Sequence, residues 1–344
     1  MSLFYRLTTD QRVTATGWEN ACLGPAASAG WLIGGGPSLA RLPCDDIARS
    51  PAPKFGINLA GTKLLRPNFW TAYDPTIRFH KSLYLDAGIA KFLPRSRAMN
   101  LVPETTYKVC ECPQTCFFDR DPQRGYHNFL DRQSLGIVDW GDSLVQAIDI
   151  AYRLGFRRLF LAGCECGVRP VSDWTAAAAE RGVSYVEGEA LSDFAQRCRE
   201  AGLSQAAMEA FPAASIYHFD EEKTFSAMLR TDGHYYRIVQ ALRLSRQSLG
   251  AAGMELISVT PGSRLNHFFE YRPVERVLDE LRWQAGDPAR EPTRGLYTQM
   301  AERPRLADGL MRDMPPPRRA EVGKGPAAAD EGARGELVVE VVEG

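Results

Sequence analysis

The sequence predicts an α/β fold with a Rossmann-like, open and mostly parallel sheet and helices on both of its faces. Short apolar runs that end in small or polar residues alternate along the chain with segments of helical spacing. The run Trp31–Ile33 breaks into three glycines, as a buried strand does where it turns toward a helix. Segment 142–154 has apolar residues at helical spacing and stops at Gly155 before another apolar run.

The other elements follow in chain order. We expect strands at 54–60, 68–74, 98–102, 159–162 and 255–260, and helices at 82–92, 175–181, 189–202, 235–252 and 274–283. Residues 103–135 contain prolines, cysteines and a charged run, and are expected to form an irregular loop or lid.

Changes in composition suggest how the chain is organised. We expect a lead segment at 1–28, a Rossmann-like nucleotide-binding core at 29–170, a helical insertion acting as a lid at 171–228, the remainder of the core at 229–285, and a disordered tail at 286–344. The insertion is rich in Ala, Glu and Arg, whereas Pro, Gly, Arg and Ala dominate the tail.

Charge and hydropathy narrow the range of partners. The 41 basic and 42 acidic residues leave a formal net charge of −1, so no overall field recruits nucleic acid or an acidic membrane. The first residues carry charges and no apolar core, and no stretch approaches the roughly 18 apolar residues of a membrane span. We expect a cytoplasmic protein with no nucleic-acid partner, and the oligomeric state stays open.

Eight cysteines include two close groups, Cys110, Cys112 and Cys116, and then Cys164 and Cys166. Five thiols could hold zinc or an iron–sulfur centre if the fold joined them, but the spacing fits neither pattern well. Disulfides are a second alternative, and ordinary buried or loop cysteines a third. We favour the third and assign no metal site.

The glycine turn is the strongest functional signal in the chain. Gly34, Gly35 and Gly36 let a ligand approach the backbone, and Pro37 and Ser38 suit a helix start. A helix N-terminus after such a turn favours phosphate, although a tight turn without a ligand has the same pattern. The turn is not a Walker loop, because the Lys that follows its last glycine is missing. The third glycine of the dinucleotide fingerprint is also missing, which disfavours NAD.

Two carboxylates follow expected strands. Glu165 comes directly after the strand at 159–162, and ligands of open parallel sheets bind at such carboxyl ends. Asp74 ends the strand at 68–74 and could bind Mg²⁺ or act as a base, but an aspartate before proline also commonly starts a turn.

Four motifs together resemble a known group of proteins. They are G-G-G-P-S-L, F-G-I-N, A-Y-D and G-D-S-L-V-Q-A-I-D-I-A-Y-R-L-G-F-R-R-L-F-L-A-G-C-E. In this order they resemble bacterial lipooligosaccharide sialyltransferases and archaeal 6-hydroxymethylpterin pyrophosphokinase-like proteins, which both have Rossmann-like cores. The resemblance covers about residues 30–167, with a weaker match at 258–266.

The resemblance implies a nucleotide site. In the sialyltransferases the G-x-G-P-S-L turn cradles the phosphate of a CMP-activated donor, and its positions here are Gly34, Gly36, Pro37 and Ser38. Gly35 departs from the pattern, because the sialyltransferases have Asn there. A contact to the nucleotide is therefore missing, which argues against CMP-sialic acid in particular.

Three further polar positions match this group. Asn58 corresponds to the Asn that ends the second strand and touches the nucleotide, and Ser143 to the serine that opens the long helix. Glu165 stands where both groups have Asp, and its longer side chain could reach a base, a ribose or a metal. Asn58 and Ser143 are also residue types that cap helices, as is Asp142.

A late histidine serves as general base in these sialyltransferases. His218, His234 and His267 are available, and we rank His234 first because two tyrosines follow it and could steady a leaving phosphate. Arg264 could neutralise phosphate or pair with a carboxylate.

Three functions stay open. The first is a sialyltransferase-like glycosyltransferase with a nucleotide-sugar co-substrate, possible CMP linkage included, and a small-molecule or glycan acceptor. The second is a pyrophosphokinase that uses ATP and Mg²⁺ on a pterin-like molecule. The third is a non-catalytic nucleotide-binding or scaffold protein. We expect no tightly bound cofactor.

Overall fold

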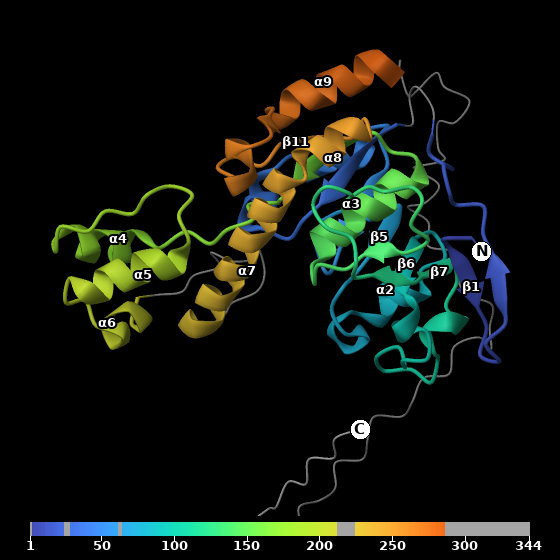
Figure 1. Cartoon of the computed structure of the whole chain (residues 1–344), viewed down its shortest axis with the longest axis horizontal. Helices are drawn as coiled ribbons and strands as arrows, with labels where there is room; N and C mark the ends of the chain where they lie inside the picture. The colour runs from blue at the N-terminus through green and yellow to red at the C-terminus, as the bar shows by residue number, and fades with distance from the viewer. Residues whose placement is uncertain (1, 24–27, 61–63, 212–223, 286–344) are drawn as a thin grey trace, which may run out of the picture. The chain divides into compact units, whose positions relative to one another are not determined.

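The computed structural model describes residues 2–23, 28–60, 64–211 and 224–285 (Figure 1). Two expectations, the tail at 286–344 and the candidate base His218, lie outside the described residues. Within the described part no helix is long and apolar enough to cross a membrane.

A ten-stranded sheet forms the centre of the described residues, in the order β12-β11-β10-β3-β4-β5-β6-β7-β1-β2. Neighbours from β12 to β7 pair in parallel, and β1 and β2 pair antiparallel at one edge. The strands are β1 (Tyr5–Leu7), β2 (Val13–Ala15), β3 (Ala29–Ile33), β4 (Lys54–Ile57), β5 (Phe69–Thr71), β6 (Ala90–Pro94), β7 (Thr115–Phe118), β10 (Arg158–Ala162), β11 (Glu255–Ser258) and β12 (Glu270–Tyr271), with β8 (Arg120–Asp121) and β9 (Ile137–Val138) as a separate pair.

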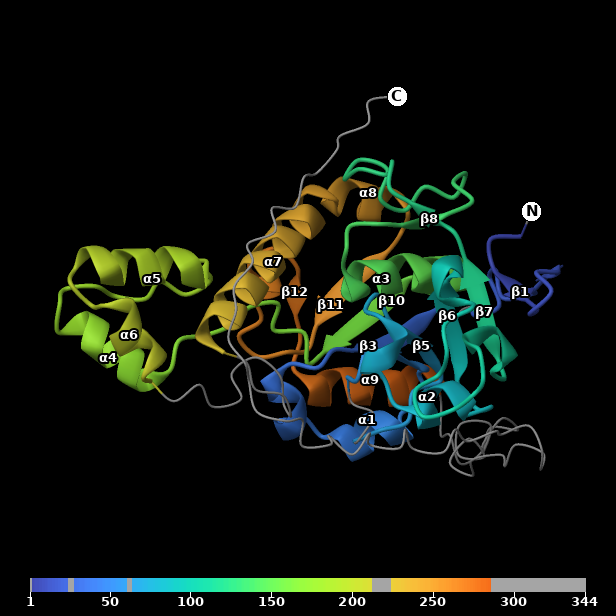
Figure 2. The same ribbon diagram turned by 90° about the horizontal axis from the view of Figure 1, so that it is seen from below.

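Helices flank this sheet on both faces, which confirms the expected fold class. Figure 2 shows α1 and α9 on one face and α3 and α8 on the other. The α-helices are α1 (Cys44–Arg49), α2 (Lys81–Leu85), α3 (Ser143–Leu154), α4 (Ser172–Ala179), α5 (Leu191–Glu200), α6 (Gln205–Glu209), α7 (Phe225–Leu244), α8 (Arg246–Ala251) and α9 (Val274–Ala285). The 3₁₀-helices are η1 (Pro37–Arg41), η2 (Thr76–Arg78), η3 (Arg95–Arg97), η4 (Val109–Glu111) and η5 (Arg264–His267).

The order of the strands creates a switch point between β3 and β10. From β3 the chain proceeds outward through β4, β5, β6 and β7, and it returns to the opposite side of β3 as β10. Ligands of open parallel sheets bind at the carboxyl ends of the strands beside such a point.

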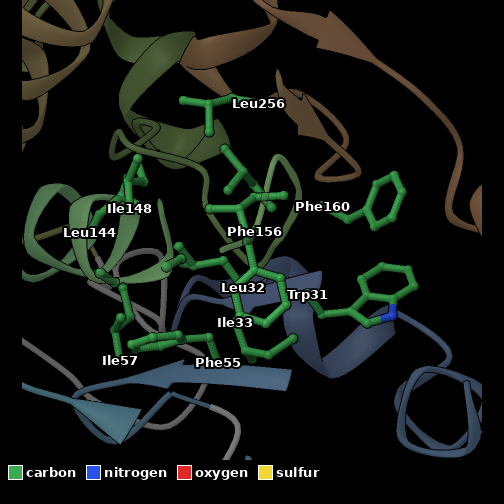
Figure 3. Close-up of a cluster of buried hydrophobic side chains, with 14 of the residues drawn as sticks. Trp31, Leu32, Ile33, Phe55, Ile57, Leu144, Ile148, Phe156, Phe160 and Leu256 are labelled. Atoms are coloured by element: carbon green, nitrogen blue, oxygen red, sulfur yellow. The ribbon is translucent and has the colours of Figure 1, made fainter. Parts of the chain in front are cut away.

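Side chains of the central strands pack on both faces of the sheet. In Figure 3, Trp31 and Phe160 lie on one side, and Leu144 and Ile148 of α3 lie on the other. All five residues of β3 are buried, as expected for a parallel strand covered on both faces. The Trp31 indole donates a 2.8 Å hydrogen bond to the Ser50 hydroxyl at the end of α1, which satisfies its buried N–H.

The expected helix at 82–92 is wrong in its second half. Helix α2 ends at Leu85, and the strand β6 begins at Ala90. Lys91 interrupts the apolar run, yet it is fully buried in β6 because its ammonium donates to the carbonyls of Asp86, Ile89 and Pro113 at 2.7–2.8 Å. Because backbone carbonyls satisfy its charge, a lysine can stand inside this buried strand. It interrupts the apolar run by which a strand would be recognised.

The expected strand at 98–102 is also wrong. The expectation that residues 103–135 form only an irregular loop is wrong as well. Residues 98–100 form a turn and a bend after η3, and Leu101 makes a single bridge with Lys108. The strand β7 lies within 103–135 and pairs with β6. The antiparallel strand β1 pairs with β7, so the lead segment extends the sheet.

The insertion has a hydrophobic core of its own. Helices α4 and α5 agree with the expected helices to within a few residues, and Trp174, Leu191 and Phe194 pack together with Met228 of α7. Helix α7 begins at Phe225, well before the expected start at Tyr235.

Candidate functional site

A cavity of about 680 Å³ opens at the carboxyl ends of β3, β4, β5 and β10, beside the switch point. It is walled by α7 and by the N-terminus of α3. Most of the expected site residues line it: Gly34, Gly35, Gly36, Asn58, Asp74, Ser143, Glu165 and His234. In the described part of 171–228, the expected lid, Ala227 alone lines this cavity.

The glycine turn is packed against the turn that follows β10. Gly34 N donates to Ala162 O at 2.7 Å, and Gly36 N donates to Gly163 O at 2.8 Å. A Cβ on Gly34 would lie 2.4 Å from Gly163 O, closer than atoms can approach. Gly34 is therefore required for backbone packing, as in a tight turn.

Glu165 occupies the position at which a phosphate was expected. Its Oε1 accepts a 2.5 Å hydrogen bond from Ser38 N at the start of η1, and a Cβ on Gly36 would lie 1.5 Å from Oε2. Among the described residues, Oε2 is buried without a hydrogen-bond partner. A carboxylate of the protein itself thus binds the N–H group that was expected to bind a ligand.

Asn58 and Ser143 join three elements at the floor of the cavity. Ser143 Oγ donates to Asn58 Oδ1 at 2.8 Å and accepts from Tyr73 N at 3.0 Å, so α3 is tied to the ends of β4 and β5. Asn58 has a φ of 53°, a left-handed conformation that asparagine tolerates better than most residues. Within the described residues its Nδ2 makes no hydrogen bond, which leaves an amide donor at the cavity wall.

His234 and Asp142 form a pair inside the cavity. His234 Nε2 lies 3.0 Å from Asp142 Oδ2, while Asp142 Oδ1 caps α3 by accepting from Leu144 N and Val145 N. Because a carboxylate only accepts hydrogen bonds, Nε2 carries the proton and Nδ1 is the basic nitrogen. The side chain of Asp142 is only 10% exposed, so the pair is partly shielded from water.

Asp74 is already paired with a cation. Arg78 Nη1 lies 2.8 Å from Asp74 Oδ2, and both side chains are partly exposed. In the described part of the chain, no group of three or more His, Cys, Asp or Glu side chains is placed to hold a metal ion. The expected role of Asp74 as a Mg²⁺ ligand or base therefore gains no support from the geometry.

Arg264 lies outside this cavity and joins parts of the chain. Its guanidinium is buried against Asp232 at 3.1 Å and donates to Cys166 O and Glu189 O. Asp232 in turn accepts from Val168 N, which follows β10, and from Leu191 N at the start of α5. The pairing with a carboxylate that the sequence left open is therefore present, and a contact of Arg264 with phosphate stays a prediction.

A second cavity of about 440 Å³ adjoins the first and shares Glu165 and Gly167 with it. Pro37 and Arg264 line this second cavity. Pro37 is thus separated from the expected glycine-turn site, and Ser38 contributes its backbone N–H to Glu165.

The cysteines are free thiols, as all eight lie within the described residues without a disulfide. Burial raises the pKa of Cys112 to about 12 and the pKa of Cys116 to about 11. Burial also raises the pKa of Cys164 and of Cys166 well above the ordinary value of a thiol. Protonated, buried thiols are poor nucleophiles.

Sequence reasoning missed two functional candidates, Asp142 as the partner of His234 and Arg230 as a cavity residue. Arg230 and His234 both lie on α7 and both line the cavity. Their spacing of i and i+4 places them on one helix face, and an earlier expected start of this helix would have found Arg230.

Comparison with known protein families, with curated proteins and with solved structures finds no match. A functional assignment therefore rests on the residues and geometry of the cavity.

Proposed function

We propose that this protein is a nucleotide-dependent transferase, a glycosyltransferase that uses a nucleotide-activated sugar. The observation that carries the proposal is the His234–Asp142 pair inside the cavity at the sheet's switch point. A base held in one tautomer by a carboxylate is the arrangement that removes a proton from a hydroxyl nucleophile.

The pair supports a direct transfer. The acceptor hydroxyl gives its proton to His234 Nδ1 while its oxygen forms a bond to the anomeric carbon. The bond from that carbon to the phosphate oxygen breaks, and its electron pair leaves with the nucleotide. Asp142 stabilises the imidazolium that forms and holds the ring in position.

One polar atom at the cavity wall is available to orient the donor. Asn58 Nδ2 can donate to a base or ribose oxygen. The resemblance of the motif around Asn58 to the nucleotide-contacting strand of sialyltransferases supports the same assignment.

The pyrophosphokinase alternative has less support. It requires carboxylates that hold Mg²⁺ against the phosphates of ATP. Asp74 is paired with Arg78, and one oxygen of Glu165 is bound to Ser38 N. A non-catalytic nucleotide-binding or scaffold role is an outcome that the experiment distinguishes.

Thermal unfolding with a panel of ligands tests the proposal. The panel is CMP, CMP-sugars, UDP-sugars, GDP-sugars and ATP with Mg²⁺. A ligand that binds only the native state raises the Tm, and we expect a nucleotide or nucleotide sugar to do so without metal. A shift with ATP that requires Mg²⁺ would favour the pyrophosphokinase. A rise in Tm, together with no release of nucleotide from any sugar donor in a turnover assay, would favour the scaffold role. No shift in Tm with any ligand would overturn the proposal.

A variant of Asn58 tests whether the nucleotide binds beside this residue. Asn58→Asp keeps the oxygen that accepts from Ser143 and tolerates the left-handed backbone, but it removes the NH₂ donor. We expect this variant to lose the ligand-induced rise in Tm. Asn100→Asp, outside the cavity, is the matched control and should retain it.

A further inference from the structure

The glycine turn has few groups left for a phosphate. The backbone N–H groups of Gly34, Gly36 and Ser38 are bonded to Ala162 O, Gly163 O and Glu165. Among the described residues, only the N–H of Gly35 in this turn has no acceptor. The Glu165 carboxylate adds a negative charge beside the turn, which opposes the approach of an anion.

Among the described residues, the basic side chains that line the cavity are Arg78, Arg230 and His234. Arg78 is paired with Asp74, and His234 with Asp142. Within the described residues Arg230 makes no ion pair and no hydrogen bond, and it is exposed. The cavity therefore has one arginine whose charge is not matched by a carboxylate of the described chain.

The position of Arg230 relates it to the base. Residues four apart on a helix are neighbours, so Arg230 and His234 present a cation and a base from one face of α7. Both side chains line the same cavity. In a direct displacement the leaving phosphate lies on the opposite side of the anomeric carbon from the acceptor oxygen, so Arg230 holds the phosphate on one side of the sugar and His234 takes the proton on the other.

We propose that Arg230 binds the phosphate of the nucleotide, in place of the glycine turn. The inference rests on the proposed function and names the group that recognises its leaving group. Guanidinium matches phosphate oxygens with two parallel hydrogen bonds. As the anomeric bond breaks, negative charge grows on that phosphate, and Arg230 stabilises it. The Gly35 N–H supplies a second donor at the cavity wall.

Calorimetric titration separates the phosphate contact from the rest of the nucleotide. The probes are the four common nucleoside 5′-monophosphates and the matching nucleosides, titrated into the whole protein. A hydrogen bond to a charged group contributes roughly 1.5–3 kcal/mol, so Arg230→Ala should weaken monophosphate binding about 10- to 100-fold. Nucleoside affinity should stay within about twofold, because the nucleoside lacks the phosphate.

Two further variants complete the test. Arg230→Lys keeps the charge without the fork and should recover part of the lost affinity. Arg237→Ala removes an exposed arginine of the same helix outside the cavity and should change neither affinity. Equal losses for nucleoside and monophosphate, or an unchanged monophosphate affinity in Arg230→Ala, would overturn this inference and leave the proposed function standing. Failure of every monophosphate to bind the unaltered protein would overturn both.

Discussion

Asp142 uses its two carboxylate oxygens for different purposes. Oδ1 accepts from the first backbone N–H groups of α3, while Oδ2 lies 3.0 Å from His234 Nε2. The helix that floors the cavity and the base that projects from α7 are thereby held by the same side chain. The orientation of the base depends on the folding of α3.

Asp142→Asn separates these two roles. Asparagine caps helices about as well as aspartate, so the free energy of unfolding should change by less than about 0.5 kcal/mol. The amide can donate to the ring and favour the wrong tautomer, so release of nucleotide from a sugar donor should fall at least about 100-fold. Asp142→Ala should also lower the free energy of unfolding by about 1 kcal/mol, because the helix cap is lost. Urea unfolding and turnover measure both effects, and full turnover in Asp142→Asn would contradict the role given to this pair.

Gly36→Ala tests the contact between the glycine turn and Glu165. The new methyl group would overlap Glu165 Oε2, and relief of such overpacking costs roughly 1–3 kcal/mol. We expect a smaller cost for the same change in a Glu165→Ala background, because the overlapping carboxylate is absent. Urea unfolding of the four proteins gives the coupling. An equal cost in both backgrounds would show that Glu165 does not lie against the turn.

Arg264→Ala tests the structural role given to this arginine. The change leaves the carboxylate of Asp232, which is fully buried, without its cation, and should lower the free energy of unfolding by about 3–5 kcal/mol. Arg169→Ala, which breaks an exposed pair with Glu187, should cost less than about 1 kcal/mol. If Arg264→Ala instead kept its stability and lost nucleotide affinity, Arg264 would be a ligand contact after all.

Stability should increase with pH because of Lys54. Burial lowers the pKa of Lys54 from 10.5 to about 7 in the folded protein. Between these values the unfolded chain binds more protons, so the free energy of unfolding increases with pH there, by at most about 1.4 kcal/mol per pH unit. The cost of burying the charge is fully present below pH 7.

Lys54→Met isolates this contribution. Burial also lowers the pKa of Lys91 to about 8, and Lys91 is present in both proteins, so their difference reports Lys54 alone. Urea unfolding from pH 7 to 9.5 should give a shallower increase for Lys54→Met. Parallel curves for the two proteins would contradict the low pKa.

The sequence predicted the elements whose apolar pattern is continuous. The expected strands at 54–60 and 159–162 correspond to β4 and β10, and α3 has the expected limits because Asp142 and Gly155 cap it. The first half of α7 was not predicted because its polar residues interrupt the apolar spacing that indicates a helix. One of them, Asp232, is buried only because Arg264 neutralises it.

The gathering of site residues at strand ends could be predicted, but their partners could not. Ends of parallel strands meet at one edge of a sheet, which brings Asn58 and Glu165 into one cavity. The pairing of Asp142 with His234 joins residues 92 positions apart, and no local pattern reports it. The hydrogen bond from Ser38 N to Glu165 requires that the two turns pack at van der Waals distance. Glycines allow such close packing, but the sequence does not indicate which turn will pack against which.

The most direct test of the transferase assignment is the turnover of a bound nucleotide sugar by the unaltered protein and by His234→Ala. His80→Ala, an exposed histidine that lines neither cavity, is the control. We predict that His234→Ala binds the donor with nearly unchanged affinity but releases nucleotide and transfers sugar at least about 100-fold more slowly, whereas His80→Ala is unaffected. Turnover by His234→Ala equal to that of the unaltered protein would contradict the assignment of His234 as the base.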